Sequence, residues 1–181
     1  ELKNVKKIYS TLRAYTVIRT DGSVFSWGDN DFGGDNSHLQ NDLNNNVKSI
    51  SSTSSAFAAL KNDGSVTTWG NSDYGGVSTS VNDQLVNVSK IFSNSSAFAA
   101  LKSDGSVVTW GHQGHGGDSS SKQSKLNNVK DIFSTSNAFA AQKDDNTVVS
   151  WGRFSNHDDV YHKEPNNVIK VYSNMNAFAV L

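Results

Sequence analysis

The sequence predicts an all-β protein, a β-propeller-like array of blades that are each about 41 residues long. Three observations support this prediction: one segment recurs at constant spacing, every copy divides into short apolar strands bounded by turn residues, and no copy is large enough to bury an apolar face alone. The copies align on a Trp-Gly pair, at Trp27, Trp69, Trp110 and Trp151. Such a period is typical of propellers and solenoids.

The repeat divides the chain into four full units and a partial fifth within one domain, residues 1–181. The approximate units are 4–45, 46–86, 87–127, 128–166 and the partial 167–181. The pattern leaves open whether the array closes into a small ring or forms an open arc of a larger propeller. An arc leaves apolar blade faces bare at both ends. We therefore expect the ends to be capped, closed on each other, or covered by a partner.

The first strand of each unit usually has a β-branched residue beside an aromatic one, as in Ile91-Phe92. Adjacent residues of a strand face opposite ways, so both faces of this strand are predicted to be buried. The strand recurs at Val5 to Ser10, Val47 to Ser52, Val88 to Ser93, Val129 to Ser134 and Val168 to Ser173.

The second strand is rich in alanine, as in Ala56 to Leu60. Alanine is a poor strand former, so its repetition indicates a place where neighbouring backbones come too close for larger side chains. A helix is the competing interpretation, but five residues between turn signals are too few for one.

The third strand leads to Trp-Gly and follows an Asp-Gly turn. We expect a tight hairpin whose central residues need positive φ, which glycine adopts at no steric cost. In the fourth unit Asn146 replaces the glycine, and asparagine is a non-glycine residue that tolerates the left-handed region. The turn geometry, rather than glycine itself, is thus what the fold requires.

A polar, glycine-rich loop follows each Trp-Gly, and a Ser- and Asn-rich connection then leads to the next unit. A short fourth strand is one interpretation of that connection. The loops differ between the copies, so they are where we place candidate binding residues. These are Asp29, Asp31, Phe32, Asp73, Tyr74, His112, His115, Arg153 and Phe154.

The segment at residues 24–33, Val-Phe-Ser-Trp-Gly-Asp-Asn-Asp-Phe-Gly, preceded by Asp21-Gly22 and an apolar strand, resembles the regulator of chromosome condensation repeat. The resemblance covers nearly the whole chain. It implies a β-propeller that serves protein interactions, in a family that includes nuclear exchange factors, scaffolds and secreted bacterial effectors. The chain departs from the family pattern where Gly-Gly-Asp or Gly-Gly-Val replaces Gly-Gln-Leu-Gly. These departures indicate a divergent branch.

Composition excludes several classes of protein. The formal charge of −1 and the pI near 6.6 provide no electrostatic footprint for nucleic acid. The absence of cysteine excludes a disulfide scaffold and thiolate metal sites. No stretch is apolar enough to insert into a membrane, and the first residues lack the features of a signal peptide. The compartment is left open, with a secreted or extracellular place favoured for a soluble chain.

Catalytic and metal signatures are weak. His112 and His115 have a metal-like spacing, but ligation needs three or more convergent donors. Asp29, Asp31 and Asp35 resemble the start of a calcium loop whose later ligand positions are Gly33 and Gln40. We therefore predict no metal, no cofactor and no enzymatic activity, because repeated hairpins do not assemble one asymmetric set of reacting groups.

The sequence predicts a non-catalytic binding module, a protein-protein interaction platform that belongs to a larger secreted or effector protein. Its partners are a protein or the rest of a larger chain, with self-association through the end blades as a further option. Two alternatives stay open. Phe32 and Tyr74 would serve a carbohydrate-binding lectin, unless they pack beneath the glycine turn. The array would otherwise be a structural spacer in a surface protein.

Overall fold

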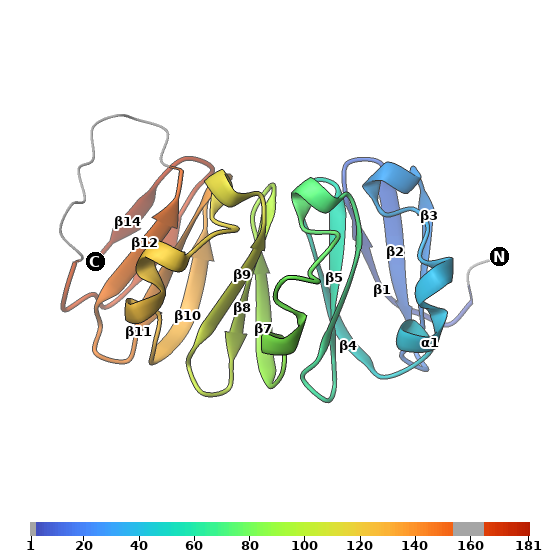
Figure 1. The fold of residues 1–181 in the computed structure, drawn as a ribbon, viewed down its shortest axis with the longest axis horizontal. Coiled ribbons are helices and arrows are strands. Elements are labelled where there is room, and N and C mark those ends of the chain that lie inside the picture. The colour runs from blue at the N-terminus through green and yellow to red at the C-terminus, as the bar shows by residue number, and fades with distance from the viewer. Residues whose placement is uncertain (1–2, 154–164) are drawn as a thin grey trace.

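The computed structural model describes residues 3–153 and 165–181, which form a row of antiparallel sheets (Figure 1). Each sheet comes from one repeat unit and is called a blade. The predicted all-β array is therefore confirmed. The strands are β1 (Val5–Ser10), β2 (Ala14–Arg19) and β3 (Val24–Gly28) in the first blade; β4 (Val47–Ser52), β5 (Ala56–Lys61) and β6 (Val66–Gly70) in the second; β7 (Val88–Ser93), β8 (Ala97–Lys102) and β9 (Val107–Gly111) in the third; β10 (Val129–Ser134), β11 (Ala138–Lys143) and β12 (Val148–Gly152) in the fourth; and β13 (Val171–Ser173) and β14 (Phe178–Val180) in the fifth.

Each of the first four blades is a meander in chain order, with the second strand in the middle, and this strand is alanine-rich in the second, third and fourth blades. In the second blade, β5 pairs with β6 so that Phe57 lies opposite Trp69 and Ala59 opposite Thr67. The same register recurs in the third and fourth blades. In the fifth blade, the described residues pair only two strands, β13 and β14.

The blades follow one another along the molecule, and the first and fifth lie at opposite ends (Figure 1). Contact between blades runs through consecutive first strands, from β1 to β4, β7, β10 and β13. The array is therefore an open arc in these residues rather than a closed ring. This arrangement leaves one sheet face uncovered at each end.

Small side chains fill the space between blades. Ala56, Ala58 and Ala59 are fully buried, and they pack between the neighbouring sheets. The alanine-rich segment is thus a strand, because helix formation would lose its pairing on both edges. The prediction that both faces of the first strand are buried is wrong for the first and fifth blades, where Ile8 and Tyr172 are exposed. The residue equivalent to Ile8 in the second blade, Ile50, is buried against the preceding blade.

The Asp-Gly hairpins have a geometry that differs from the expected one. Only the glycine has a positive φ, 81° at Gly64, and its amide donates to the carbonyl of Lys61 at 3.1 Å. The Lys61 amide in turn donates to the carbonyl of Ser65, which closes a three-residue loop with a bulge. The expectation of positive φ at both central residues is wrong, because the longer loop needs only one. Asn146 takes the same conformation with φ 62°.

An asparagine with positive φ precedes every first strand. Asn87 has φ 57°, and its carbonyl accepts from the amide of Ser103 at the second strand of the same unit. We expect Asn87→Ala to lower the free energy of unfolding by about 1 kcal/mol, because alanine pays more for the left-handed region. Asn87→Gly should stay within about 0.5 kcal/mol of wild type. Urea unfolding measures both, and equal losses would contradict this explanation.

The connections between blades form short helical turns instead of the fourth strand considered from the sequence. They carry Leu43, Leu85 and Leu126 into the gap between adjacent blades, where all three are buried. The described segments are η1 (Asn30–Phe32), η2 (Ser37–Leu39), α1 (Gln40–Leu43), η3 (Ser72–Tyr74), η4 (Asn82–Gln84), η5 (Gln113–His115) and η6 (Ser120–Lys125).

Candidate functional site

The tryptophan of one blade holds the glycine-rich loop of the preceding blade in place. The indole Nε1 of Trp69 donates to the carbonyl of Gly33 at 3.1 Å, and Trp110 bonds Gly75 in the same way. Gly33 has φ 87°, and a Cβ placed there would come within 2.7 Å of the Phe57 ring in the next blade. Both the positive φ and the short distance to the Phe57 ring therefore require glycine at this position. We call this repeated contact the indole latch; Trp151 makes it with Gly116.

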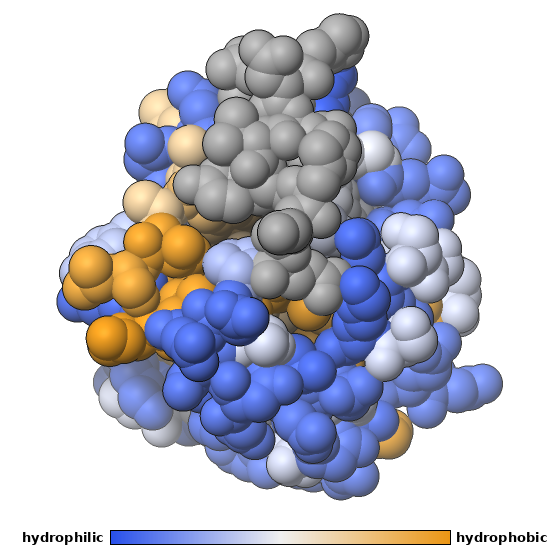
Figure 2. Space-filling model, turned by 90° about the vertical axis from the view of Figure 1, so that its left-hand side faces the viewer, coloured by the Kyte–Doolittle hydropathy of each residue, from blue (hydrophilic) through white to orange (hydrophobic). Residues whose placement is uncertain are grey.

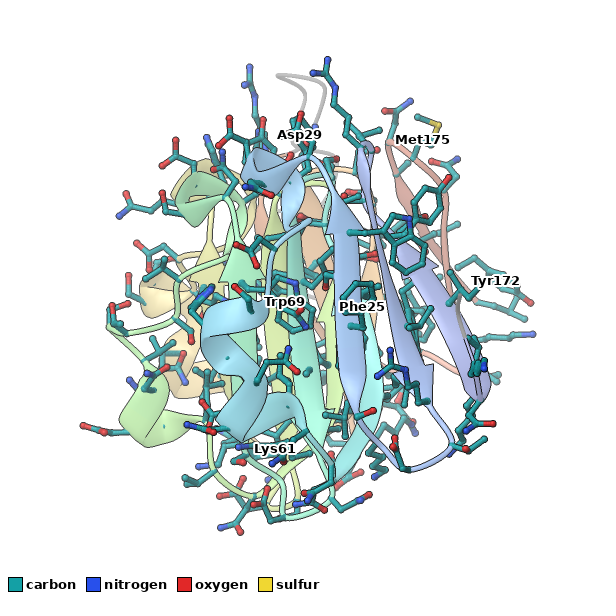
Figure 3. The ribbon with its side chains drawn as sticks, turned by 90° about the vertical axis from the view of Figure 1, so that its right-hand side faces the viewer. Phe25, Asp29, Lys61, Trp69, Tyr172 and Met175 are labelled. Carbon is teal, nitrogen blue, oxygen red and sulfur yellow. The ribbon has the colours of Figure 1, made fainter. Side chains whose placement is uncertain are left out.

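The three latched loops stand on one edge of the array, which we call the loop rim (Figure 1). Their backbones are alike: η1, η3 and η5 each end at a left-handed glycine. Asp29 caps η1 by accepting from the amide of Asp31 at 3.0 Å, and Asn71 caps η3 through Asp73. The opposite edge, the turn rim, holds the Asp-Gly turns. Figure 3 shows Asp29 on the loop rim and Lys61 toward the turn rim.

Side chains from the turn between the first and second strands hold each loop from behind. The Thr11 hydroxyl donates to the carbonyl of Phe32 at 2.9 Å, and Thr53 donates to that of Tyr74 at 3.0 Å. Asn94 replaces threonine in the third blade and donates to the carbonyl of His115 at 2.7 Å. The sequence interpretation missed these residues. Their signal is a Thr or Asn three positions before the alanine-rich strand.

The structure separates the predicted site residues into two groups. Asp29, Asp31, Asp73, His112 and Arg153 are exposed on or beside the loop rim. The aromatic residues and His115 are less accessible. Phe32 and Tyr74 are half-buried and pack against the core between the blades. Phe154 lies outside the described residues.

Charge changes along the loop rim. The first two loops carry aspartates, and the third and fourth carry histidine and arginine. Arg13 lies 3.9 Å from Asp29, an exposed pair that contributes little stability. A backbone hydrogen bond from Ser37 lowers the pKa of Asp35, and one from Ser120 lowers that of Asp118. These carboxylates stay ionised and cap their own turns. Exposed carboxylates thus occur along all three latched loops, and Arg153 adds a positive charge at the start of the fourth loop.

His112 and His115 stack against each other, with ring centroids 4.2 Å apart. The Nδ1 atom of His115 is buried without a hydrogen-bond partner among the described residues. Burial lowers the pKa of His115 below its ordinary value of 6.5, and the nearby charges of His112 and Arg153 lower it further. The imidazole of His115 thus favours its neutral form.

This shift predicts a pH dependence of stability. The unfolded chain binds a proton at His115 more readily than the folded one, so stability is present above pH 6.5 and is lost as the pH falls through the lowered pKa. His115→Gln should flatten the free energy of unfolding between about pH 7 and 5. Urea unfolding at each pH tests this. His38→Gln, on the connection after the first blade, is the matched control. Parallel curves for wild type and His115→Gln would contradict the prediction.

An open groove of about 500 Å³ lies beside the rim, between the loop segments of the second and third units. Val77, Val108 and Trp110 supply apolar lining, and Gln113 and Gln123 supply polar lining. Val77 is exposed in the otherwise polar connection. The groove is thus an open recess beside the rim with both apolar and polar lining.

The described residues contain no group of three or more His, Cys, Asp or Glu side chains that could hold a metal ion. The helices in this part of the chain are all too short or too polar to cross a bilayer.

Comparison with known proteins agrees with the blade geometry. Residues 47–75 match the family model for the regulator of chromosome condensation (RCC1) repeat. A comparison with curated protein sequences gave no significant match. Similar solved structures are Prp20p from Saccharomyces cerevisiae (TM-score 0.63, 20% identity, covering 97% of this chain and 54% of that one) and human WBSCR16 (TM-score 0.58, 16% identity, covering 100% and 58%).

Yeast RCC1 (Prp20) bound to Kap60 is also similar, with TM-score 0.62 and 20% identity over 94% of this chain and 52% of that one. The chain thus spans about half the length of the solved structures it matches. Residues 47–75 thus match an RCC1 repeat, and the whole chain shares the fold of these RCC1 structures.

Proposed function

We propose that the chain is a non-catalytic, protein-binding module that contacts its partner through the loop rim. One observation carries this proposal: three loops share a backbone fixed by the indole latch, while their exposed side chains differ from blade to blade. Binding residues commonly sit on loops that a rigid scaffold positions. The rim residues concerned are Asp29, Asp31, Asp73, His112 and Arg153.

The rim carboxylates support binding over catalysis. The side chains of Asp29 and Asp35 accept amides of their own turns at 3.0 and 2.8 Å. A carboxylate held this way serves as a cap and a surface charge, whereas a general base needs a free path to its substrate. The carboxylates along the rim, with Arg153 at its end, suit a partner of complementary charge pattern.

The similar proteins support the class of partner. Prp20p was described with its binding properties to Gsp1p and histones, and yeast RCC1 was solved bound to Kap60. These are longer chains, so no particular partner carries over. Membership of a larger secreted or effector protein remains a prediction. Self-association through the uncovered end faces completes the proposal.

The lectin alternative has less support, because Phe32 and Tyr74 are partly buried and pack against the core between the blades. Sugar stacking needs an open aromatic face. No feature of the loops specifically favours a structural spacer. We therefore keep a protein as the partner class and make carbohydrate an outcome of the test.

Site-specific crosslinking tests the proposal. A photoreactive residue is placed at Asp31, Asp73 or Gln113 on the loop rim, and at Asn62 or Ser103 on the turn rim as matched controls. We expect the same protein to crosslink from the loop-rim positions and not from the controls. Reversing charge with Asp31→Lys and Asp73→Lys together should weaken that binding at least about tenfold.

Two results would contradict the proposal. Crosslinking from the turn rim alone would move the interface away from these loops. Binding to a glycan array that is lost on Tyr74→Ala, with no protein crosslinked, would favour a lectin instead.

A further inference from the structure

Exposed apolar side chains gather at the two ends of the arc. Of ten large hydrophobic residues that are exposed in the described part of the chain, eight lie on or beside the first and fifth blades. They are Ile8, Leu12, Tyr15 and Phe25 at the first blade, and Ile169, Tyr172, Met175 and Leu181 at the fifth. Monomeric surfaces seldom concentrate apolar area in this way.

The first blade presents an outer surface that the inner blades bury. We call it the head face, and it consists of Ile8, Tyr15, Phe25 and Trp27. Figure 3 shows Phe25 on the blade at this end of the molecule. Tyr15 stacks on Trp27 with ring centroids 5.6 Å apart, as Phe57 stacks on Trp69 in the second blade at 5.3 Å. Yet Tyr15 is 50% exposed and Phe57 is 0% exposed.

The fifth blade presents the opposite outer surface, which we call the tail face, consisting of Tyr172, Met175, Ala179 and Leu181. These residues are exposed, whereas Phe178 and Val180 on the other side of β14 pack toward the fourth blade. Figure 2 shows a hydrophobic patch on this end of the molecule. Each end is thus half of a blade-to-blade contact.

A ladder of backbone hydrogen bonds gives the two faces a direction. In the turns between first and second strands, each amide donates to the carbonyl of the next blade. The steps are Leu12 to Ser54 (3.0 Å), Ser54 to Ser95 (2.9 Å), Ser95 to Ser136 (3.2 Å) and Ser136 to Met175 (2.8 Å). Within the described residues, the ladder leaves the Leu12 carbonyl and the Met175 amide without partners. The tail therefore offers a donor, and the head offers an acceptor.

The head face is bulkier than the equivalent face of the second blade. Phe25 stands where that blade has Thr67, and the buried Val17 beside it stands where that blade has Ala59. The exposed ring of Phe25 therefore gives the head face additional apolar surface for contact with another sheet.

We propose that two copies of this chain associate head to tail, with the tail face of one copy on the head face of the next. The amide of Met175 then donates to the carbonyl of Leu12 in the second copy, and Tyr172 packs beside Tyr15 and Phe25. This inference rests on the self-association part of the proposed function and does not use the loop rim. Such a heterologous contact builds either a ring or an open filament.

Sedimentation velocity of the full chain between about 1 and 100 μM tests the association. We expect the mass to rise with concentration above the 19.6 kDa of one chain. Phe25→Asp removes the head and Tyr172→Asp removes the tail, because a charge placed in the contact has no partner there. Each variant alone should weaken association at least about tenfold. Val86→Asp, which changes an exposed apolar residue of the second unit outside the groove, is the matched control and should assemble like wild type.

Mixing the two end variants gives the decisive measurement. Phe25→Asp keeps its tail and Tyr172→Asp keeps its head, so the mixture should form a species of two chains and grow no further. Its formation also shows that both variants are folded. A wild-type chain that stays at one mass over the whole range would overturn the proposal. Association of Tyr172→Asp with itself would overturn the head-to-tail direction. These masses do not depend on the loop rim. If the crosslinking experiment failed, the head-to-tail association would still be expected to give the same masses.

Discussion

Gly117→Ala is expected to lower the free energy of unfolding by about 3 kcal/mol or more, whereas Gly114→Ala in the same loop should change it by less than about 1 kcal/mol. A Cβ at Gly117 would lie 2.4 Å from the carbonyl oxygen of Gly111, a backbone atom of the Trp-Gly pair. That oxygen cannot move without shifting β9 and the latch. A Cβ at Gly114 meets only the ring of His112, at 3.4 Å.

Urea unfolding followed by circular dichroism measures both glycine variants. The comparison is matched because both substitutions add one methyl group to one loop, and neither glycine has positive φ. The close approach of two backbones at Gly117 is the contact that Gly114 lacks. Equal losses of stability would mean that this approach does not fix the loop.

Trp110→Ala is expected to cost about 3 to 5 kcal/mol, because it empties a buried site and leaves a carbonyl unpaired. The indole is 3% exposed, stacks on Phe98 at 5.1 Å and donates to Gly75. Trp27→Ala should cost clearly less, since Trp27 occupies the same position in its blade but makes no latch among the described residues.

The tryptophan comparison is made at low protein concentration, so that association of the end faces does not add to stability. Trp110→Phe keeps an aromatic ring but removes the indole N–H and part of the buried volume, with an expected loss of about 1 to 3 kcal/mol. Similar losses for Trp27→Ala and Trp110→Ala would show that burial within one blade, rather than contact between blades, carries the stability.

Much of the fold could be predicted from the sequence, because the recurring residues mark the strands and turns of each blade. The spacing of the tryptophans gives the blade period, and Asn146 in place of glycine reveals the left-handed turn residue. The alanine-rich strand could be predicted since close packing between sheets excludes larger side chains. These features are local in the chain, or they recur often enough to be compared between copies.

The contacts between blades could not be predicted in the same way. The bond from Trp69 to Gly33 joins residues 36 positions apart, and its partner is a carbonyl that every residue possesses. The turn type was wrong for a related reason: Asp-Gly fits both a two-residue and a three-residue loop, and hydrogen bonding at Lys61 and Ser65 decides between them. The candidate residues occupy equivalent loops of different units, but how far each one is buried depends on its contacts with the neighbouring blade. The assignment of Phe32 and Tyr74 as binding residues stays a prediction.

The ladder and the indole latch join each unit to its immediate neighbours only. Duplication or loss of a gene segment that encodes one whole unit would therefore add or remove one blade together with its hydrogen bond in the ladder. The arrangement of the remaining blades would stay the same. A partial insertion would instead break the alternation of donor and acceptor. Such a chain can change length in evolution by whole blades, and the curvature of the array is kept because each contact between neighbouring blades is unchanged.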